Sequence, residues 1–185
     1  CKKENDDISV PKNEMHQTNA FIFVKPGNRS VYNVSGKSNG YPYHYANGFV
    51  LEITPATEKN THTINFIFDF GLYYKKHLHA IWQTNSDALL STDSLGRSQV
   101  VLKANPSIGE VTYIVTGSDT IYRKVIDVGI QVTVPAGIFS CIKIKEYYSN
   151  KPEYIEEYYS FKEGLIKNEL LNSSRTYVST LASKN

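Results

Sequence analysis

Two histidines, His77 and His79, are separated by a single residue. On a β-strand both imidazoles would point to the same face, a spacing that occurs in metal sites. A third ligand would have to come from elsewhere in the chain, with His44, His62 and Asp69 as candidates. Nothing in the spacing demands such a site, and paired histidines on a solvent-facing strand are common. We therefore expect neither a metal nor another cofactor.

The other reactive side chains lack the neighbours that catalysis requires. Cys141 lies among apolar residues such as Ile142, which favours a small buried hydrophobe over an activated thiolate. Glu156 and Glu157 are adjacent, so on a strand they would face opposite sides and could not act together as acid and base. The sequence contains no phosphate-binding glycine loop, no Gly-x-Ser-x-Gly elbow and no paired Cys-x-x-Cys motif. We assign no catalytic residue and expect a protein that is not an enzyme.

Aromatic side chains are the strongest candidates for a binding surface. Tyr41, Tyr43 and Tyr45 alternate along the chain and would line one face of a strand. Trp82, the single tryptophan, closes another predicted strand. Flat rings with polar tips can stack on sugar rings or extended peptides, although they serve equally well as cross-strand pairs. We take Tyr41, Tyr43, Tyr45 and Trp82 as candidate ligand contacts.

The elements that would position these residues are β-strands. The 185 residues include 14 Tyr and 8 Phe, which suit a half-buried pleated surface. Turn residues recur every eight to twelve positions, and between them apolar and polar residues alternate, as in Ile64-Asn65-Phe66. No window shows an apolar stripe with helical spacing behind a capping residue. The pattern predicts ten to thirteen strands with little or no helix, as an antiparallel meander that forms a sandwich or a strongly curved sheet.

Two hairpins are predicted from turn chemistry. Asn47-Gly48 lies between two strand-like runs and matches a two-residue type I′ turn, because both residues tolerate positive φ. Pro135-Ala136, followed by Gly137, matches a type I turn that resolves into a bulge. No repeat or linker divides the body. We expect one all-β domain over residues 19–185, with any two halves meeting near residues 103–106.

The second half of the chain carries a recognisable succession of hairpins. Residues 134–139 read VPAGIF, and residues 158–167 read YYSFKEGLIK. This succession resembles a family of uncharacterised bacterial envelope lipoproteins, of Bacteroides type, that share a VPAGxF hairpin and a YYxxxxGLVK hairpin. The resemblance covers roughly residues 105–171. It implies a curved antiparallel sheet and carries no assigned activity.

The N-terminal segment predicts an attachment to a membrane. Cys1 is followed by a short charged run, and residues 1–18 are polar and without pattern. Bacterial lipoproteins begin, after processing, with a cysteine that carries a diacylglyceryl group, and acyl chains contribute about 0.8 kcal/mol for each buried CH₂. We expect Cys1 to be lipidated and residues 1–18 to be a flexible tether. The predicted location is the outer membrane, on its periplasmic or cell-surface side.

The composition argues against several functional classes. The net charge is +2 with acids and bases interspersed, which gives no electrostatic footprint for nucleic acid. No apolar run approaches the roughly 20 residues of a membrane-spanning helix. The leading hypothesis is a monomeric, non-enzymatic envelope lipoprotein that binds an extended ligand (a glycan, a peptide or an envelope protein) on a sheet face. Two alternatives stay open: a periplasmic lipid or lipoprotein carrier with an apolar cavity, and an envelope hydrolase built on a metal at His77 and His79.

Mass spectrometry of the mature N-terminus, isolated from native membranes, tests the predicted anchor. We expect a diacylglyceryl adduct on Cys1. An unmodified Cys1, or a mature chain that retains residues upstream of it, would contradict the prediction.

Overall fold

The computed structural model describes residues 20–56, 60–70, 75–92, 96–116, 119–171 and 175–185. Across these ranges the elements are strands, with no helix among them. In chain order they are β1 (Arg29–Ser38), β2 (Tyr41–Pro55), β3 (Thr61–Asp69), β4 (Lys75–Thr84), β5 (Ala88–Thr92), β6 (Ser98–Lys103), β7 (Val111–Thr116), β8 (Asp119–Val134), β9 (Gly137–Tyr148), β10 (Tyr154–Ser160), β11 (Gly164–Leu171) and β12 (Arg175–Lys184). The predicted all-β class is confirmed.

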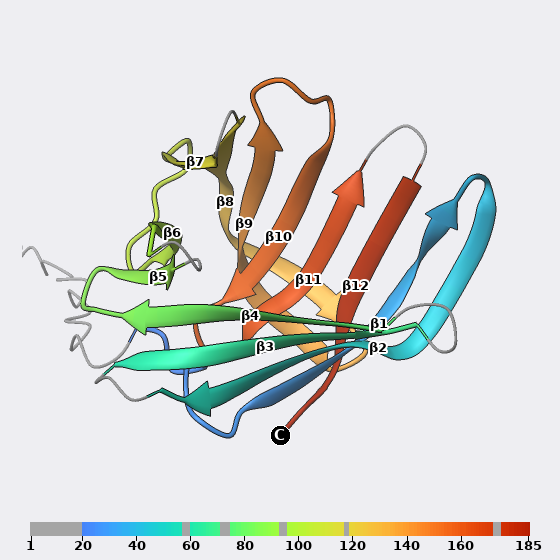
Figure 1. Cartoon of the computed structure of the whole chain (residues 1–185), viewed down its shortest axis with the longest axis horizontal. Helices are drawn as coiled ribbons and strands as arrows, with labels where there is room; N and C mark the ends of the chain where they lie inside the picture. Colours follow the sequence, from blue (N-terminus) through green and yellow to red (C-terminus); the bar gives the residue numbers. More distant parts are fainter. Residues whose placement is uncertain (1–19, 57–59, 71–74, 93–95, 117–118, 172–174) are drawn as a thin grey trace, which may run out of the picture.

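All the strands belong to one antiparallel sheet with the order β6-β5-β4-β3-β2-β1-β12-β11-β10-β9-β8-β7 (Figure 1). Two six-stranded meanders, β1–β6 and β7–β12, are therefore joined where β1 pairs with β12. Within each meander, short turns bring strands that are neighbours in sequence side by side. Of the two predicted shapes, the structure shows the strongly curved sheet.

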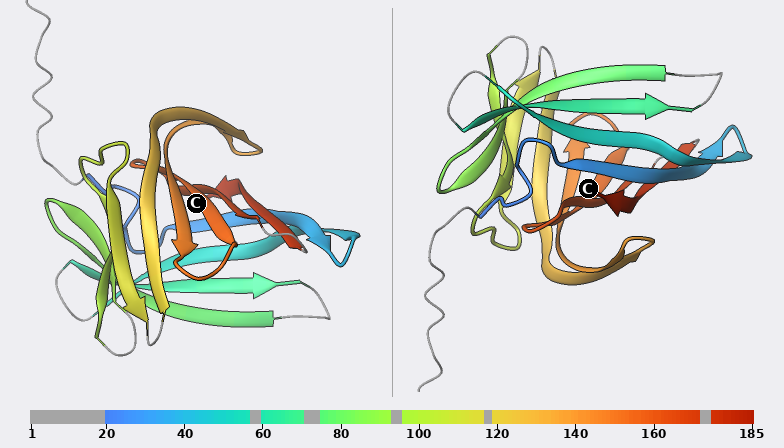
Figure 2. Two further views of the ribbon diagram at one scale, coloured as in Figure 1. Left: turned by 90° about the horizontal axis from the view of Figure 1, so that it is seen from above. Right: turned by 90° about the horizontal axis from the view of Figure 1, so that it is seen from below.

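The sheet curls until its two end strands, β6 and β7, lie near each other (Figure 2). In the described part of the chain no backbone ladder joins these strands, so the barrel is nearly closed. Residues 104–110 connect β6 to β7, and the predicted meeting point of two halves falls at the start of this connection. We call the gap between β6 and β7 the seam.

Two predictions concern the N-terminal segment, which lies outside the described residues. They are the tether, residues 1–18, and the lipidation of Cys1, and both stay predictions. Separately, no helix in the described ranges is long and apolar enough to cross a membrane.

The prediction of a hairpin turn at Asn47-Gly48 is wrong. The turn between β1 and β2 lies earlier, at Asn39-Gly40, where φ is 51° and 83° and Ser38 lies opposite Tyr41. Asn47 also has a positive φ of 57°, but it lies inside β2, where the pairing with β1 shifts register. An Asn-Gly pair suits a bulge as well as a turn. Here it forms a bulge because β1 continues alongside.

The predicted hairpin at Pro135-Ala136 is confirmed, but the bulge expected at Gly137 is not found there, because the pairing of β8 with β9 runs without a register shift from Val134 to Ile130. Val134 lies opposite Gly137, whose φ is 138°, at the start of the β8–β9 pair. Farther along, β8 shifts register against β9 at residues 125–127 and again at 128–130. Bulges bend a strand and increase its twist. They account for the strong curvature of β8 and β9 (Figure 2).

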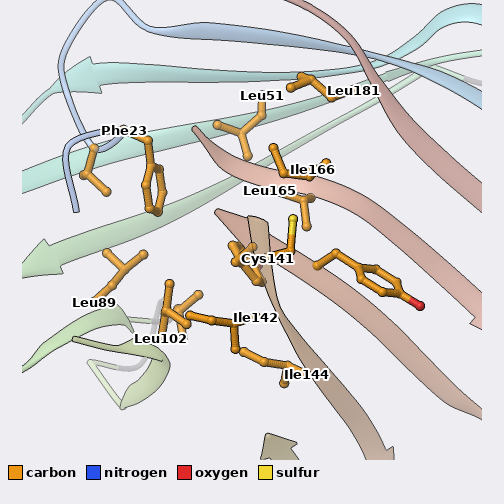
Figure 3. Close-up of a cluster of buried hydrophobic side chains, with 14 of the residues drawn as sticks. Phe23, Leu51, Leu89, Leu102, Cys141, Ile142, Ile144, Leu165, Ile166 and Leu181 are labelled. Carbon is orange, nitrogen blue, oxygen red and sulfur yellow. The ribbon is translucent and has the colours of Figure 1, made fainter. Parts of the chain in front are cut away.

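A single hydrophobic core fills the inside of the barrel, and both meanders contribute to it. Leu51 and Leu89 come from the first meander, Ile142 and Cys141 from the second, and their side chains point toward one another (Figure 3). Burial raises the pKa of the Cys141 thiol to about 11. Its position agrees with the prediction of a small buried hydrophobe.

The core is well filled. The two best-formed hollows between described residues have volumes of about 10 and 20 Å³. Each has room for roughly one water molecule. The first lies beneath Phe23 and Trp82, and the second lies beside Arg123 at the seam.

The guanidinium of Arg123, on β8, is buried inside the barrel. Its Nη1 donates to Glu146 Oε2 at 2.5 Å, and its Nη2 donates to Glu157 Oε2 at 2.7 Å. The Arg123 side chain is 8% exposed. A buried charge is tolerated only when it is paired and hydrogen-bonded. The cluster therefore ties β8, β9 and β10 together from within.

The same guanidinium reaches across the seam. Its Nη2 also donates to the backbone oxygen of Val101 on β6, at 3.1 Å. Arg97, which precedes β6, donates to the backbone oxygen of Val115 on β7, at 3.3 Å. Lys103 at the end of β6 forms an ion pair with Glu110, just before β7. Cationic side chains thus bridge the seam, where the backbone ladder is missing.

Replacing Arg123 by Met should destabilise the fold strongly, because two buried carboxylates would lose their common partner. We expect the free energy of unfolding to fall by about 3 kcal/mol in urea denaturation. The control is Lys75→Met, which breaks the exposed ion pair with Asp69 and should cost less than about 0.5 kcal/mol. The triple variant Arg123→Met/Glu146→Gln/Glu157→Gln should recover part of the loss. Equal losses for the two single variants would contradict the role of Arg123.

The raised pKa of the Glu146 carboxyl predicts how the stability of the fold changes with pH. Burial raises its pKa above the ordinary 4.5, and the charge of Glu157 raises it further, while Arg123 opposes the rise. The stability that this carboxyl contributes is therefore present below about pH 4.5 and lost as the pH rises through the folded-state pKa. Glu146→Gln removes this dependence. In urea denaturation at several pH values, the variant should gain stability relative to the wild type as the pH rises. If the stability of the variant relative to the wild type instead falls as the pH rises, this assignment is contradicted.

Candidate functional site

Four tyrosines form one row across the strands of the second meander. Tyr113 on β7 lies opposite Tyr122 on β8, which lies opposite Tyr147 on β9, which lies opposite Tyr154 on β10. We call these four residues the tyrosine row. Neighbouring positions on the same strands, such as Arg123, point into the barrel, so the row lies on its outer face.

Ring contacts fix the orientation of the row. The ring centroids of Tyr113 and Tyr122 are 6.3 Å apart with planes tilted by 45°. Those of Tyr122 and Tyr147 are 5.4 Å apart, and the planes are only 20° from parallel. At the far end the Lys145 ammonium lies 3.7 Å from the ring centroid of Tyr154, a cation–π contact. The rings are therefore held in place before any ligand arrives.

The tyrosine row is open to solvent. Tyr113, at the edge strand, is 68% exposed, and the other three rings are half-buried. Within the described residues none of the four hydroxyls has a protein hydrogen-bond partner. Each hydroxyl can thus still donate and accept. Because Tyr122 and Tyr147 stack on each other, the row offers mainly ring edges and free hydroxyls to solvent, and a sugar or an extended peptide can contact both.

The predicted tyrosines of β2 occupy a different place. Tyr41, Tyr43 and Tyr45 lie on one face of β2, and the ring centroids of Tyr43 and Tyr45 are 5.8 Å apart. The Tyr45 ring stacks on Phe70 at 5.0 Å, and both Tyr43 and Tyr45 pack against the core. Tyr41 is 79% exposed. Two of the three therefore serve packing, and one is available to a ligand.

Gly36 explains why Tyr43 is fixed. It lies opposite Tyr43 on β1, and the Tyr43 hydroxyl donates to the backbone oxygen of Thr176 at 3.1 Å. A Cβ at position 36 would lie 2.6 Å from that hydroxyl and 2.0 Å from the Thr176 oxygen. The ring of Tyr43 thus covers the missing side chain of a glycine, a common cross-strand arrangement.

Trp82 lies in the core. It is 4% exposed, and its ring meets Phe23 and Phe66 edge-on, with centroid distances of 6.2 and 6.4 Å. The structure therefore does not bring Trp82 to a surface with the β2 tyrosines. A surface ligand cannot reach it.

The two histidines share one face of β4, and both are exposed. His79 Nδ1 lies 2.7 Å from the side-chain oxygen of Asn65. In the described part of the chain, no group of three or more His, Cys, Asp or Glu side chains could hold a metal ion. None of the third ligands considered from the sequence is brought to His77 and His79.

Glu156 and Glu157 face opposite sides of β10, in keeping with their adjacency. Glu156 pairs with Lys143 at 2.8 Å on the outer face, whereas Glu157 pairs with Arg123 inside. Arg123 was not predicted as the partner of Glu157. The sequence did contain one indication of it. Arg123 is two residues from the apolar Val125, so on a strand with one buried face both side chains point to the same side.

The tyrosine row was also missed. Its pairing of Tyr113 with Tyr122 could have been found, because residues equidistant from a hairpin turn lie opposite each other. The pairing of Tyr122 with Tyr147 could not, because two register shifts separate it from the Pro135-Ala136 turn. Register through bulges is not readable from residue types alone.

Comparisons with known proteins identify the fold. No family model matches the chain, and no curated protein sequence matches it. A solved structure from Bacteroides fragilis, described as that of a candidate exported protein with a YmcC-like fold, is similar over 89% of this chain and 98% of that one, with a TM-score of 0.61 and 14% identity. At this identity the likeness concerns architecture, so the chain has the YmcC-like fold. The resemblance to an envelope lipoprotein family stays a prediction.

Proposed function

We propose that this protein is an exported, non-enzymatic binding protein of the bacterial envelope, and that it holds an extended glycan on the tyrosine row. The observation that carries the proposal is the direct register of Tyr113, Tyr122, Tyr147 and Tyr154 on the outer face, with free hydroxyls. A location outside the cytoplasm is supported by the description of the Bacteroides fragilis neighbour. Attachment to the outer membrane through Cys1 stays part of the proposal.

The spacing of the row favours a polymer of rings. Neighbouring strands are about 4.8 Å apart, so successive tyrosines repeat at about that interval across the sheet. A sugar unit in an extended chain has a similar length. Several units can therefore contact successive rings, and the tyrosine hydroxyls can bond to sugar hydroxyls. A peptide strand would need main-chain partners, which a sheet face does not offer.

The two alternative functions receive less support. A carrier of acyl chains needs a pocket of about 300 Å³ or more, whereas the best-formed hollows between described residues measure about 10 and 20 Å³. A hydrolase with a metal at His77 and His79 needs a third ligand, and the described residues bring none to that pair. The binding role is the one that the surface geometry favours.

Affinity electrophoresis and calorimetry with a panel of soluble polysaccharides test the proposal. We expect at least one polymer to bind the wild type, and Tyr122→Ser/Tyr147→Ser to weaken that binding about 10-fold or more, because each lost phenol removes roughly 1 kcal/mol of apolar contact and hydrogen bonding. The matched control is Tyr41→Ser, which removes an exposed tyrosine from β2 and should bind like the wild type.

Two results would contradict the proposed function. One is a wild type that binds no polysaccharide of the panel. The other is equal binding by the Tyr122→Ser/Tyr147→Ser variant, provided that its circular dichroism spectrum shows a folded protein.

A further inference from the structure

Two lysines lie beside the centre of the tyrosine row. Lys124 on β8 is directly opposite Lys145 on β9. They follow the Tyr122–Tyr147 pair on the same outer face, two positions along each strand. Lys124 is exposed and Lys145 is half-buried. Two positive charges therefore sit next to the best-stacked pair of rings.

Like charges directly opposite each other on neighbouring strands repel, and Lys145 turns its ammonium toward Tyr154 on β10, away from Lys124 on β8. Glu156 lies opposite Lys145 across β9 and β10, but its Oε2 is engaged by Lys143 at 2.8 Å and by the Tyr158 hydroxyl at 3.2 Å. No ion pair of the described residues includes Lys124 or Lys145. Among these residues Lys124 therefore has no carboxylate partner, and Lys145 has a ring in place of one.

The other lysines of this face behave differently. Lys143 is paired with Glu156, and Lys167 with Glu169 at 2.6 Å. Lys145 instead places its ammonium over the ring of Tyr154, at 3.7 Å from the centroid. The cation–π contact holds one positive charge on the tyrosine row itself. An anionic group on a bound ligand would supply the missing counter-charge.

We infer that the ligand of the tyrosine row is an acidic polysaccharide, an inference that rests on the proposed function. Sugar units lie along the edges and hydroxyls of Tyr122 and Tyr147, while a carboxylate or sulfate of the chain lies beside Lys124 and Lys145. Hydrogen bonds from ammonium to such an anion are charge-assisted and stronger than neutral ones.

Other anionic partners fit the surface less well. Recognition of an anionic membrane surface uses clusters of about four to eight Lys or Arg residues, and this site offers two. Single-stranded nucleic acid requires a basic groove that follows the backbone, whereas this face alternates positive and negative pairs. A sugar chain with one charge per repeat matches two lysines and four rings.

The experiment compares matched polymers that differ in charge alone. The pairs are polygalacturonate against its methyl ester, and dextran sulfate against dextran. We expect the wild type to bind the charged member of at least one pair about 10-fold tighter, in low salt, than the neutral member. Lys124→Gln/Lys145→Gln should abolish this preference and keep the neutral binding. Its melting temperature should equal or exceed that of the wild type.

The matched control is Lys37→Gln/Lys76→Gln, which removes the same net charge from two exposed lysines of β1 and β4 and should keep the preference. Binding that depends on Tyr122 and Tyr147 but not on polymer charge would overturn this inference and leave the proposed function standing. Binding to none of the four polymers would overturn this inference, and binding to anionic phospholipid vesicles but to no polysaccharide would overturn the proposed function as well. An equal loss of preference in the control would show long-range attraction and overturn the lysine site.

Discussion

The buried guanidinium of Arg123 links the two ends of the sheet where no backbone ladder joins their described residues. The two end strands, β6 and β7, come together without a backbone ladder, and unpaired strand edges are sites of unwanted association. One buried guanidinium binds Glu146 and Glu157 on its own side of the seam and the Val101 backbone oxygen on the other. The carboxylates make burial of the guanidinium tolerable, and the guanidinium in turn makes burial of the carboxylates tolerable. The shape of the barrel depends on this buried ion cluster.

The outer surface follows from the same arrangement. Positions that alternate with Arg123 on β8 point outward, so anchoring this side chain inside also sets Tyr122 and Lys124 on the opposite face. Side chains carried by strands are held more precisely than side chains on loops. The tyrosine row spans four strands of the half whose inner face holds the buried ion cluster. A filled core behind it makes the row a rigid platform and leaves little internal space for a ligand.

Local patterns in the sequence predicted the architecture because strands and turns depend on residues that are close together in the chain. Period-two alternation identified the strands, and Pro135-Ala136 identified one hairpin. Asn47-Gly48 failed because positive φ suits a bulge as well as a turn, and only the path of β1 decides between them. Trp82 looked like a surface aromatic because alternation does not say which face is buried at a given strand. Arg123 and the tyrosine row depend on register between strands, which two bulges control and no short motif records.

The central claim is that ligand binding occurs on the outer face of β7–β10 and not on β2. Ring-labelled tyrosine gives separate NMR signals for both sets, so one titration with polygalacturonate, followed by one with dextran sulfate, compares them in the same molecule. We expect the signals of the tyrosine row, Tyr113, Tyr122, Tyr147 and Tyr154, to shift with added polymer, and those of Tyr41, Tyr43 and Tyr45 to stay in place. Shifts confined to the β2 tyrosines, or no shift in either set, would contradict it.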